Sequence, residues 1–377
     1  MRILVVAGAR PNFVKVAPVL EALRSAGADS TVVHTGQHYD IRMSDAFFRD
    51  LDIPEPDYHL GVGSGTHAVQ TARVMEAFEP VLLEVGPEWV VVVGDVNSTL
   101  ACALVTAKLK EETGARLAHV EAGLRSRDWR MPEEVNRVVA DRLSDLLFAP
   151  SADAVENLVM EGIARERIAL VGNVMIDTLL AQLGAARQLD VRARLGLGGG
   201  AYTVATVHRP SNVDGVDSLA VILEALAEIS GRLPVVLPLH PRTRKSVERL
   251  GLGALLARLV VTEPLGYREM LALTDGAAVV LTDSGGLQEE TTMLGVPCVT
   301  LREQTERPIT IECGTNRLAP WPLTVAGILA AFREAAAQGR SAVGSRAPWG
   351  WDGHAAERIA TLLVGEAPAS DSTVAIA

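Results

Sequence analysis

Short apolar runs alternate along this chain with longer segments in which apolar residues recur every three or four positions. In the first half we predict strands at Ile3–Ala7, Asp29–His34, Trp89–Val93 and Leu117–Val120. Amphipathic helical spacing is found between them, in Val14–Ser25, His67–Val85, Ser98–Glu111 and Glu133–Leu143. Short apolar strands alternating with helices predict a parallel β-sheet that is covered on both faces.

The same alternation begins again after Gly172, with apolar runs at Tyr202–Val207, Val235–Leu239, Leu259–Val261 and Ala278–Leu281. A chain of 377 residues is long enough for two separate cores. We therefore predict an α/β protein with two Rossmann-like, doubly wound domains. The predicted boundaries are 1–172 for the first domain, 173–352 for the second, and 353–377 for a final helix with a flexible tail.

Composition and charge narrow the class of protein. The chain is 48% hydrophobic and 21% charged, which is typical of a globular enzyme. Its formal net charge of -11 argues against nucleic acid as a partner. No apolar run is long enough to span a membrane, and Ile3–Ala7 is too short for a signal peptide. We expect no membrane association and a cytoplasmic location.

The sequence shows no motif for a metal or a nucleotide cofactor. Cys102, Cys298 and Cys313 lack the spacing of a zinc site or of a disulfide framework. Neither G-x-G-x-x-G after a strand nor G-x-x-x-x-G-K-[ST] occurs, so the sequence indicates neither NAD nor ATP. His208 and His240 have no convincing set of further ligands. We predict no metal and no cofactor.

Charged residues and histidines gather where the predicted strands end. They are Arg10, Lys15, Asp95 and Glu121 in the first half, and His208 and His240 in the second. Ligands of doubly wound sheets bind outside the carboxyl ends of the strands, so this mixture predicts an active site there. Single members have simpler explanations, because Asp95 could cap a helix, and His208 could be a hydrogen-bonded core residue.

The segment Ser284–Glu290, with the sequence SGGLQEE, joins an apolar run to a predicted helix. The adjacent Gly285 and Gly286 let the backbone approach a ligand closely, and the first N–H groups of the helix attract an anion. Glu290, one turn into the helix, could hold sugar hydroxyls such as those of a ribose. The simpler alternative is an ordinary βα turn with Ser284 as the helix N-cap.

Nine short sequence blocks follow one another over nearly the whole chain. They are GARPNFVK at 8–15, TGQH at 35–38, GDVNS at 94–98, HVEAGLRS at 119–126, MPEEVNR at 131–137, VGN at 171–173, TVHRP at 206–210, TDSGGLQEE at 282–290 and ERP at 306–308. In this order they resemble the non-hydrolysing UDP-N-acetylglucosamine 2-epimerases. The resemblance implies the fold of the GT-B glycosyltransferases, with the active site between two Rossmann-like domains, and a homodimer.

The resemblance also implies a reaction, the inversion of C2 in UDP-N-acetylglucosamine to give UDP-N-acetylmannosamine. In this family UDP leaves by anti elimination, 2-acetamidoglucal forms, and UDP adds back while a proton reaches the other face. Such chemistry needs carboxylates around the sugar and cations on the leaving diphosphate, and it needs no redox cofactor.

Carried over position by position, the resemblance gives individual residues a role. Asp95, Glu121 and Glu133 would be the acid/base carboxylates, with the face served by each left open. His208 would bind the diphosphate and assist the leaving oxygen. The implied UDP-binding positions are Arg10, Lys15, Met270, Ser284, Gly285, Gly286, Glu290 and Arg307. Met270 replaces an aromatic residue that the family often has beside the uracil.

Two segments depart from the family pattern. Residues 10–15 read RPNFVK where RPEAIK is usual, and the stretch between Glu121 and Glu133 is shorter than in the best-known bacterial members. Because this stretch approaches the sugar, a modified UDP-sugar such as a diacetamido uronic acid is an alternative substrate. A GT-B glycosyltransferase or a non-catalytic UDP-sugar sensor is an alternative function.

Many bacterial members bind a second UDP-N-acetylglucosamine as an activator, through a Gln-His-x-Gln or Gln-His-x-Glu segment and an arginine of a following helix. Here the segment is Gln37-His38-Tyr39-Asp40, and the first arginine of the following region is Arg73. Asp40 is shorter than Glu and cannot donate a hydrogen bond as Gln can. We predict that the activator site is absent.

Overall fold

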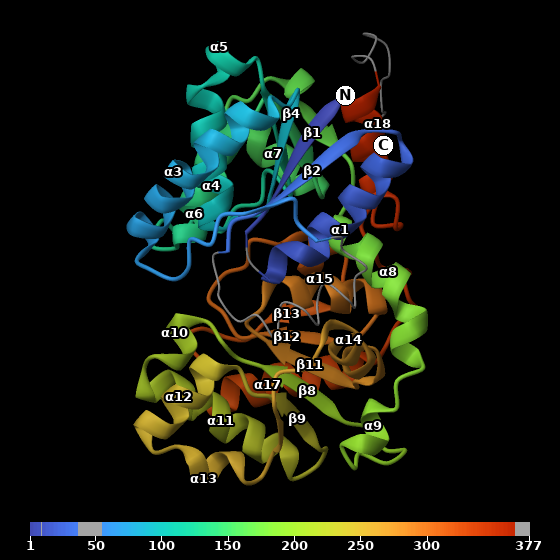
Figure 1. Ribbon diagram of the computed structural model, residues 1–377. Helices are drawn as coiled ribbons and strands as arrows, with labels where there is room; N and C mark the ends of the chain where they lie inside the picture. The colour runs from blue at the N-terminus through green and yellow to red at the C-terminus, as the bar shows by residue number, and fades with distance from the viewer. Residues whose placement is uncertain (9, 37–54, 366–377) are drawn as a thin grey trace. The chain divides into compact units, whose positions relative to one another are not determined.

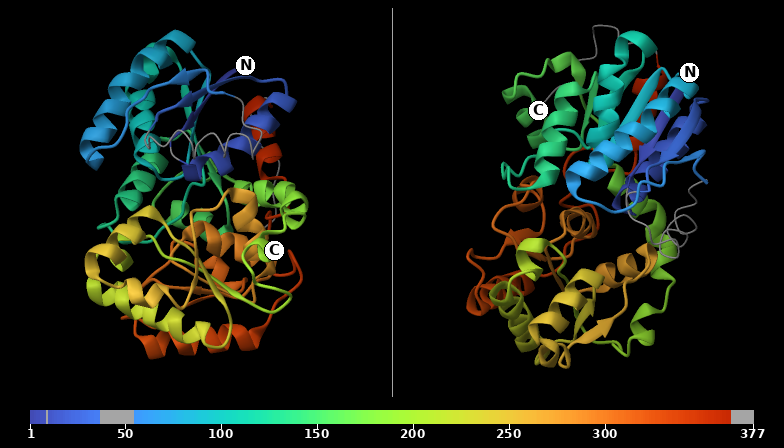
Figure 2. Two further views of the ribbon diagram at one scale, coloured as in Figure 1. Left: turned by 60° about the horizontal axis from the view of Figure 1, so that its bottom comes forward. Right: turned by 60° about the vertical axis from the view of Figure 1, so that its left-hand side comes forward.

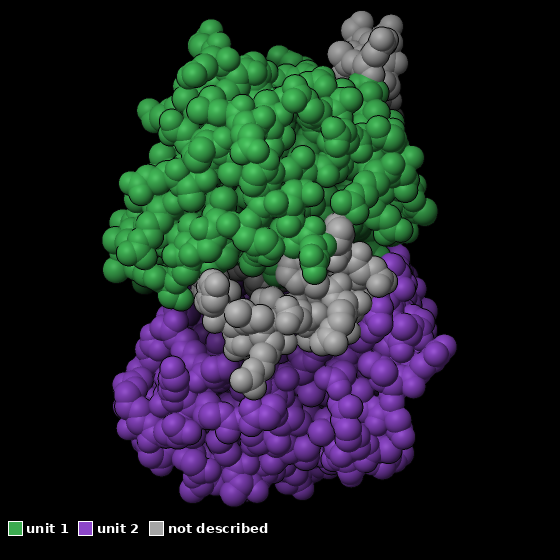
Figure 3. Space-filling model, in the orientation of Figure 1, with its two compact units in different colours: residues 1–178, 349–377 green, residues 179–348 purple. Residues whose placement is uncertain are grey.

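Two compact units make up the computed structural model, which describes residues 1–8, 10–36 and 55–365 (Figure 1). Unit 1 comprises Met1–Thr178 and Trp349–Ala377, and unit 2 comprises Leu179–Pro348 (Figure 3). Each unit is a parallel β-sheet with helices around it, so the predicted pair of Rossmann-like domains is confirmed. The chain passes from unit 1 into unit 2 after residue 178 and returns to unit 1 after residue 348. The boundaries predicted from the sequence were 172 and 352.

The sheet of unit 1 has seven strands in the order β3-β2-β1-β4-β5-β6-β7. Their bounds are β1 Arg2–Ala7, β2 Asp29–His34, β3 Tyr58–His59, β4 Trp89–Val93, β5 Arg116–Val120, β6 Leu146–Ala149 and β7 Ile168–Leu170. Every residue of β4, WVVVV, is buried, as expected for a central strand covered on both faces. The order reverses between β1 and β4, and ligands of doubly wound sheets bind at such a switch point.

Helices follow the strands of unit 1. They are α1 Arg10–Ser25, α3 His67–Val85, α4 Asn97–Lys108, α5 Lys110–Thr113, α6 Pro132–Leu143, α7 Ala152–Met160 and the 3₁₀ turn Arg165–Arg167. Helix α8, Val174–Arg187, leads from unit 1 into unit 2. The final helix α18, Ala355–Val364, packs along α1 (Figure 1). Its first turn is held by Asp177, which accepts hydrogen bonds from the Ala355 and Ala356 N–H groups.

The sheet of unit 2 has six strands in the order β10-β9-β8-β11-β12-β13. Their bounds are β8 Thr203–Thr206, β9 Val235–Pro238, β10 Val260–Thr262, β11 Val279–Thr282, β12 Cys298–Thr300 and β13 Asn316–Leu318. The order reverses between β8 and β11. The switch point of unit 2 therefore lies beside the residues that follow these two strands.

The helices of unit 2 are α9 Val191–Arg194, α10 Pro210–Val213, α11 Val216–Ser230, α12 Pro241–Leu250, α13 Gly253–Leu256, α14 Tyr267–Gly276, α15 Gly285–Leu294, α16 Ile309–Glu312 and α17 Val325–Gln338. Helices α11 and α17 pack together against one face of the sheet (Figure 2). Their apolar side chains form one continuous core with those of β8, β9, β11 and β12. No helix in the described ranges has the length and apolar character needed to cross a bilayer.

Candidate active site

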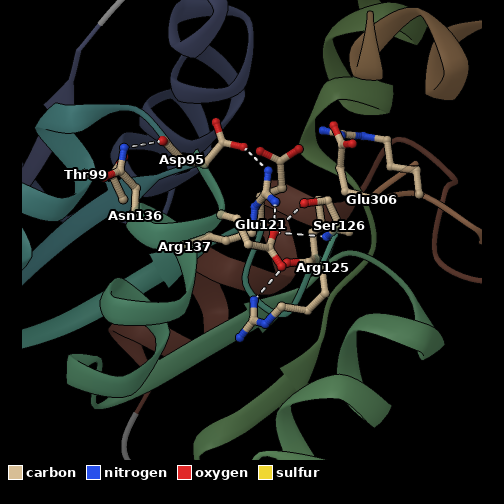
Figure 4. Close-up of polar contacts among 12 residues, drawn as sticks. Asp95, Thr99, Glu121, Arg125, Ser126, Asn136, Arg137 and Glu306 are labelled. Atoms are coloured by element: carbon tan, nitrogen blue, oxygen red, sulfur yellow. Dashed lines mark hydrogen bonds and ion pairs between the residues drawn. The ribbon is translucent and has the colours of Figure 1, made fainter. Parts of the chain in front are cut away.

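Asp95 lies two residues after the end of β4 and is held by helix α6 of the same unit (Figure 4). Arg137 places its Nη2 2.6 Å from Asp95 Oδ2, and its own side chain is only 2% exposed. The Asn136 side-chain N–H donates to the backbone carbonyl of Asp95 at 2.8 Å. The N-cap position of α4 belongs to Val96, so Asp95 is not the cap of that helix. These contacts fix a partly exposed carboxylate at the switch point of unit 1.

Glu121 follows the neighbouring strand β5 and forms a buried ion pair with Lys15 of α1. Its backbone has φ 71°, a left-handed conformation that is uncommon for a residue other than glycine. The turn is held because the N–H groups of Glu121 and Ala122 both donate to the Phe148 carbonyl at 3.1 Å. Gly94 lies beside the pair, and a Cβ there would come within 3.2 Å of Glu121 Oε2. The absence of a side chain at Gly94 therefore leaves room for this carboxylate.

The two glutamates that begin α6 have different surroundings. Glu134 is buried and accepts hydrogen bonds from the Ser126 N–H at 2.9 Å and the Arg127 N–H at 2.7 Å, and it pairs with Arg137 (Figure 4). Glu133 is half-buried, and its side chain makes no hydrogen bond or ion pair in the described part of the chain. Glu134 therefore builds the loop before α6, whereas the carboxylate of Glu133 is available to a ligand.

His208 and Asp283 form the corresponding feature of unit 2, after β8 and β11. The fully buried Asp283 accepts hydrogen bonds from the backbone N–H groups of His208 at 3.0 Å and Arg209 at 2.9 Å, and from the Asn212 side chain at 3.0 Å. His208 Nδ1 lies 3.0 Å from Asp283 Oδ1. Burial acts to raise the pKa of Asp283, but the hydrogen bond and charge of His208 hold it below its ordinary value. The carboxylate therefore stays ionised, and Nδ1 of His208 carries a proton.

His208 is not a core histidine, because its side chain is 39% exposed. With Nδ1 directed at Asp283, the free nitrogen is Nε2, which can donate or accept a proton. The ring of His240 lies nearby, with its centroid 5.7 Å away. His240 Nδ1 accepts a hydrogen bond from the Arg242 N–H and caps α12.

Helix α15 begins after β11 at the segment SGGLQEE. Ser284 occupies the N-cap position, but its side chain makes no capping hydrogen bond. A Cβ on Gly285 would lie 2.5 Å from Arg307 Nη1 and 2.8 Å from Glu306 Oε1, so a larger residue there would displace this ion pair. The N–H groups of the first turn, including that of Gly286, lie at an anion-attracting helix start.

Buried arginines and glutamates support this helix start. Glu306 is paired with Arg307 at 2.6 Å, Arg302 at 2.6 Å and Arg209 at 3.2 Å. Arg307 also lies 2.7 Å from Glu289. Three guanidinium groups thus gather around Glu306, and arginine side chains suit the binding of an anionic ligand.

Glu290 and Met270 lie on the adjacent helices α15 and α14. Burial raises the pKa of Glu290 to about 7. The charge of Glu289 also acts to raise it, and the nearby Tyr267 hydroxyl acts to lower it. Met270 is half-buried. The predicted nucleotide-binding residues Met270, Ser284, Gly285, Gly286, Glu290 and Arg307 therefore all belong to one side of unit 2, around α14 and α15.

The structure adds partners that sequence reasoning missed, namely Arg137, Glu134, Asp283 and Glu306. Only the first two left a signal, since the spacing of Glu134 and Arg137 places opposite charges on one helix face. Among the described residues no cluster of three or more histidine, cysteine or acidic side chains could hold a metal ion. The predictions for the side chain of Arg10 and for Gln37–Asp40 fall outside the described residues.

Known proteins match this chain over most of its length. The family model described as UDP-N-acetylglucosamine 2-epimerase matches residues 21–364. The UDP-N-acetylglucosamine 2-epimerase of Methanocaldococcus jannaschii is 43% identical, over 84% of this chain and 88% of the relative. The UDP-2,3-diacetamido-2,3-dideoxy-D-glucuronate 2-epimerase of Pseudomonas aeruginosa is 45% identical over the same shares of the two chains.

Solved structures resemble the whole chain as well. The crystal structure of the M. jannaschii enzyme in complex with UDP-GlcNAc and UDP has a TM-score of 0.88 and 40% identity, covering 96% of this chain and 99% of that one. The Neisseria meningitidis UDP-GlcNAc 2-epimerase bound to UDP-GlcNAc has a TM-score of 0.84 and 28% identity, covering 97% and 100%.

Proposed function

Because the chain belongs to the UDP-N-acetylglucosamine 2-epimerase family, we propose that it inverts C2 of UDP-N-acetylglucosamine to give UDP-N-acetylmannosamine. The observation that carries this proposal is the pair of carboxylates Asp95 and Glu121. They follow the neighbouring strands β4 and β5, and each is paired with a cation of unit 1. Fixed carboxylates of this kind suit proton transfer at a weakly acidic carbon.

The proposed reaction begins when a carboxylate removes the C2 proton while UDP leaves from C1. This elimination leaves a glycal with a double bond between C1 and C2. UDP then adds back to C1 as a proton is delivered to the other face of C2. Asp95 and Glu121, paired with Arg137 and Lys15, are placed to accept a proton as carboxylates. Glu133 is the third candidate for proton transfer.

The residues of unit 2 are proposed to hold UDP. The start of α15 at Ser284–Gly286 suits the diphosphate, and the exposed Nε2 edge of His208 suits its leaving oxygen. Asp283 keeps Nδ1 of His208 protonated, so Nε2 can carry a second proton to the oxygen that leaves C1. Glu290, from the same helix as Gly286, is proposed to accept hydrogen bonds from ribose hydroxyls.

A modified sugar is the second candidate substrate. The relative from P. aeruginosa, named for a diacetamido glucuronate, is as similar to this chain as the relative named for UDP-N-acetylglucosamine. We further propose that the protein is a homodimer, which sedimentation velocity tests. We also propose that it acts in the cytoplasm and needs no added cofactor.

Incubation of the purified protein with a single UDP-sugar tests the function. We expect ¹H NMR to show UDP-N-acetylmannosamine forming from UDP-N-acetylglucosamine with no acceptor, NAD or metal added. Parallel incubation with the UDP-diacetamido glucuronate compares the two substrates by kcat/KM. No epimer from either sugar, or transfer of the sugar to an added acceptor, would overturn the proposal.

A further inference from the structure

His119 of β5 is fully buried between two oxygen atoms. Its Nδ1 lies 2.6 Å from Oδ1 of Asp141, and its Nε2 lies 2.8 Å from the carbonyl oxygen of Gly94. Asp141 belongs to α6, and Gly94 is the residue between β4 and Asp95. Both ring nitrogens therefore have a hydrogen-bonding partner within unit 1.

A neutral imidazole carries only one N–H group, so one of these two contacts would bring a nitrogen lone pair against an oxygen. The Gly94 carbonyl cannot supply a proton. Asp141 is poorly suited to supply one, because its Oδ2 accepts the Gly123 N–H at 3.1 Å and lies 2.7 Å from Arg125 Nη2.

We propose that His119 is an imidazolium, protonated on both ring nitrogens, and that it is a positioning residue for the carboxylates Asp95 and Glu121. The proposal rests on the proposed function, because that function assigns proton transfer to these two carboxylates. His119 itself is buried and acts through the backbone.

The ion pair of His119 and Asp141 holds the backbone next to both candidate carboxylates, at Gly94 before Asp95 and at Gly123 after Glu121. The Gly94 N–H donates to the Val120 carbonyl at 3.0 Å, and His119 Nε2 donates back to the Gly94 carbonyl, so the ends of β4 and β5 are tied twice. Gly94 has φ 68°, and its carbonyl group leads directly into Asp95. The partner Asp141 holds the Gly123 N–H, two residues after Glu121. The strained turn at Glu121 is thus anchored by His119 before it and by Asp141 after it.

The charges around the ring balance when His119 is cationic. Asp141 lies between His119 and Arg125, and Arg125 also pairs with Glu161 at the end of α7 at 2.7 Å. These four groups form two cations and two anions. The next charged groups are already paired with one another, Asp95 with Arg137 and Glu121 with Lys15. A neutral His119 would leave these four groups, of which only Glu161 is exposed to solvent, with one excess negative charge.

NMR of the full chain with ¹⁵N-labelled histidine tests the protonation state without any substrate. We expect one histidine to keep the ¹⁵N shifts of a doubly protonated ring at a pH of about 8.5, where ordinary histidines with a pKa of about 6.5 are neutral. That signal should be absent from the His119→Gln variant and present in His354→Gln, a matched change at an exposed histidine. A neutral ring for every histidine at this pH would overturn the proposal, whether or not the enzyme acts on UDP-N-acetylglucosamine.

Kinetics of Asp141→Asn and His119→Gln test the positioning role. We expect kcat to fall about 100-fold, as for a displacement of reacting groups by about 1 Å, while the Kd for UDP changes less than about twofold. Exchange of the substrate C2 hydrogen with solvent should fall in step with kcat. Folded variants with unchanged kcat, or an equal loss of UDP binding and turnover, would refute a positioning role. If neither variant folds, the NMR result on the unaltered chain decides the protonation state.

Discussion

Asp283 holds both the backbone and the ring of His208, although the two residues are 75 positions apart in the sequence. The backbone N–H of His208 donates to Asp283 Oδ2 at 3.0 Å, and Nδ1 of the ring lies 3.0 Å from Oδ1. One buried carboxylate thus sets the place, the tautomer and the orientation of the histidine. A histidine held in this way can pass a proton through Nε2 without moving its ring.

Asp283→Asn should therefore impair chemistry more than binding. The amide loses the negative charge and can present an N–H group to Nδ1, which favours the wrong tautomer of His208. We expect kcat to fall about 10²–10⁴-fold, as for the loss of an orienting carboxylate beside a catalytic histidine. Steady-state kinetics and calorimetric titration with UDP measure the two effects. Asp275→Asn, which breaks a surface pair with Arg187, is the matched control. Near-normal turnover of a folded Asp283→Asn variant would remove the role given to His208.

The neighbouring glutamates of α6 allow a second test. Glu133→Gln should lower kcat about 10²–10⁴-fold, as expected for loss of a general acid or base, and Asp95→Asn and Glu121→Gln should do the same. The melting temperature of Glu133→Gln should stay close to that of the unaltered chain, because the Glu133 side chain makes no hydrogen bond or ion pair in the described residues. Glu134→Gln should instead lower the melting temperature, because this carboxylate accepts two backbone N–H groups and pairs with Arg137. Kinetics with differential scanning fluorimetry measures both, and a reversed pattern would transfer the catalytic role to Glu134.

The ion pair of Lys15 and Glu121 makes a prediction about stability. Lys15→Met leaves the buried Glu121 carboxylate without this cation, and breaking one partner of a buried pair costs about 3–5 kcal/mol. The double variant Lys15→Met/Glu121→Gln should be more stable than Lys15→Met alone, because it removes the uncompensated charge. Urea denaturation of the whole chain measures the free energies of unfolding. A double variant less stable than the single one would show that the two residues are not coupled as described.

Sequence reasoning located eight of the thirteen described strands, and the strands that it missed are short, with two to four residues each. Trp89–Val93 was predicted with its observed bounds, whereas β3, β6, β7, β12 and β13 were not predicted. The residues NRL of β13 have no strand pattern, and they form a strand because β12 is available for pairing. Tertiary pairing therefore decided the sheet edges, where local preference was weak.

Some residues of the candidate site could be proposed from the sequence, whereas their partners could not. Asp95, Glu121 and His208 were proposed as site residues because residues that follow parallel strands gather at the carboxyl edge of their own sheet. Their partners were not found, because Arg137 lies 42 positions from Asp95 and Asp283 lies 75 from His208. Such pairing depends on how α6 and β11 pack in three dimensions, which spacing along the chain does not encode. The candidate reactive groups could thus be proposed from the sequence, whereas the groups that pair with them could not.

Epimerisation in deuterated water should place deuterium at C2 of the product. The motive is the proposed role of Asp95 and Glu121, since a carboxylate that accepts the C2 proton would exchange it with solvent while the glycal is bound. We expect mass spectrometry and ¹H NMR to show one solvent-derived hydrogen at C2 of UDP-N-acetylmannosamine, and gradual labelling of the substrate as well. Full retention of the original hydrogen would point to internal return or to hydride transfer.

Binding of UDP-N-acetylglucosamine should strengthen as the pH rises through about 7, because of Glu290. Burial raises the pKa of this carboxyl to about 7, so the free protein holds it protonated below that pH, and only the ionised form accepts hydrogen bonds from both ribose hydroxyls. The raised pKa also means that this group's contribution to stability is fully present below its unfolded value of 4.5 and is lost as the pH rises to about 7. Affinity and stability should thus change in opposite directions over this range.

Calorimetric titration with UDP-N-acetylglucosamine at a series of pH values measures the effect, and this ligand is suitable because its diphosphate diester does not titrate near neutrality. Glu290→Gln removes the titrating group and should flatten the part of the pH dependence that Glu290 causes. His208→Gln is the matched variant, because it should leave the Glu290 contribution in place. Identical pH profiles for the unaltered chain and Glu290→Gln would show that Glu290 does not titrate in the binding equilibrium.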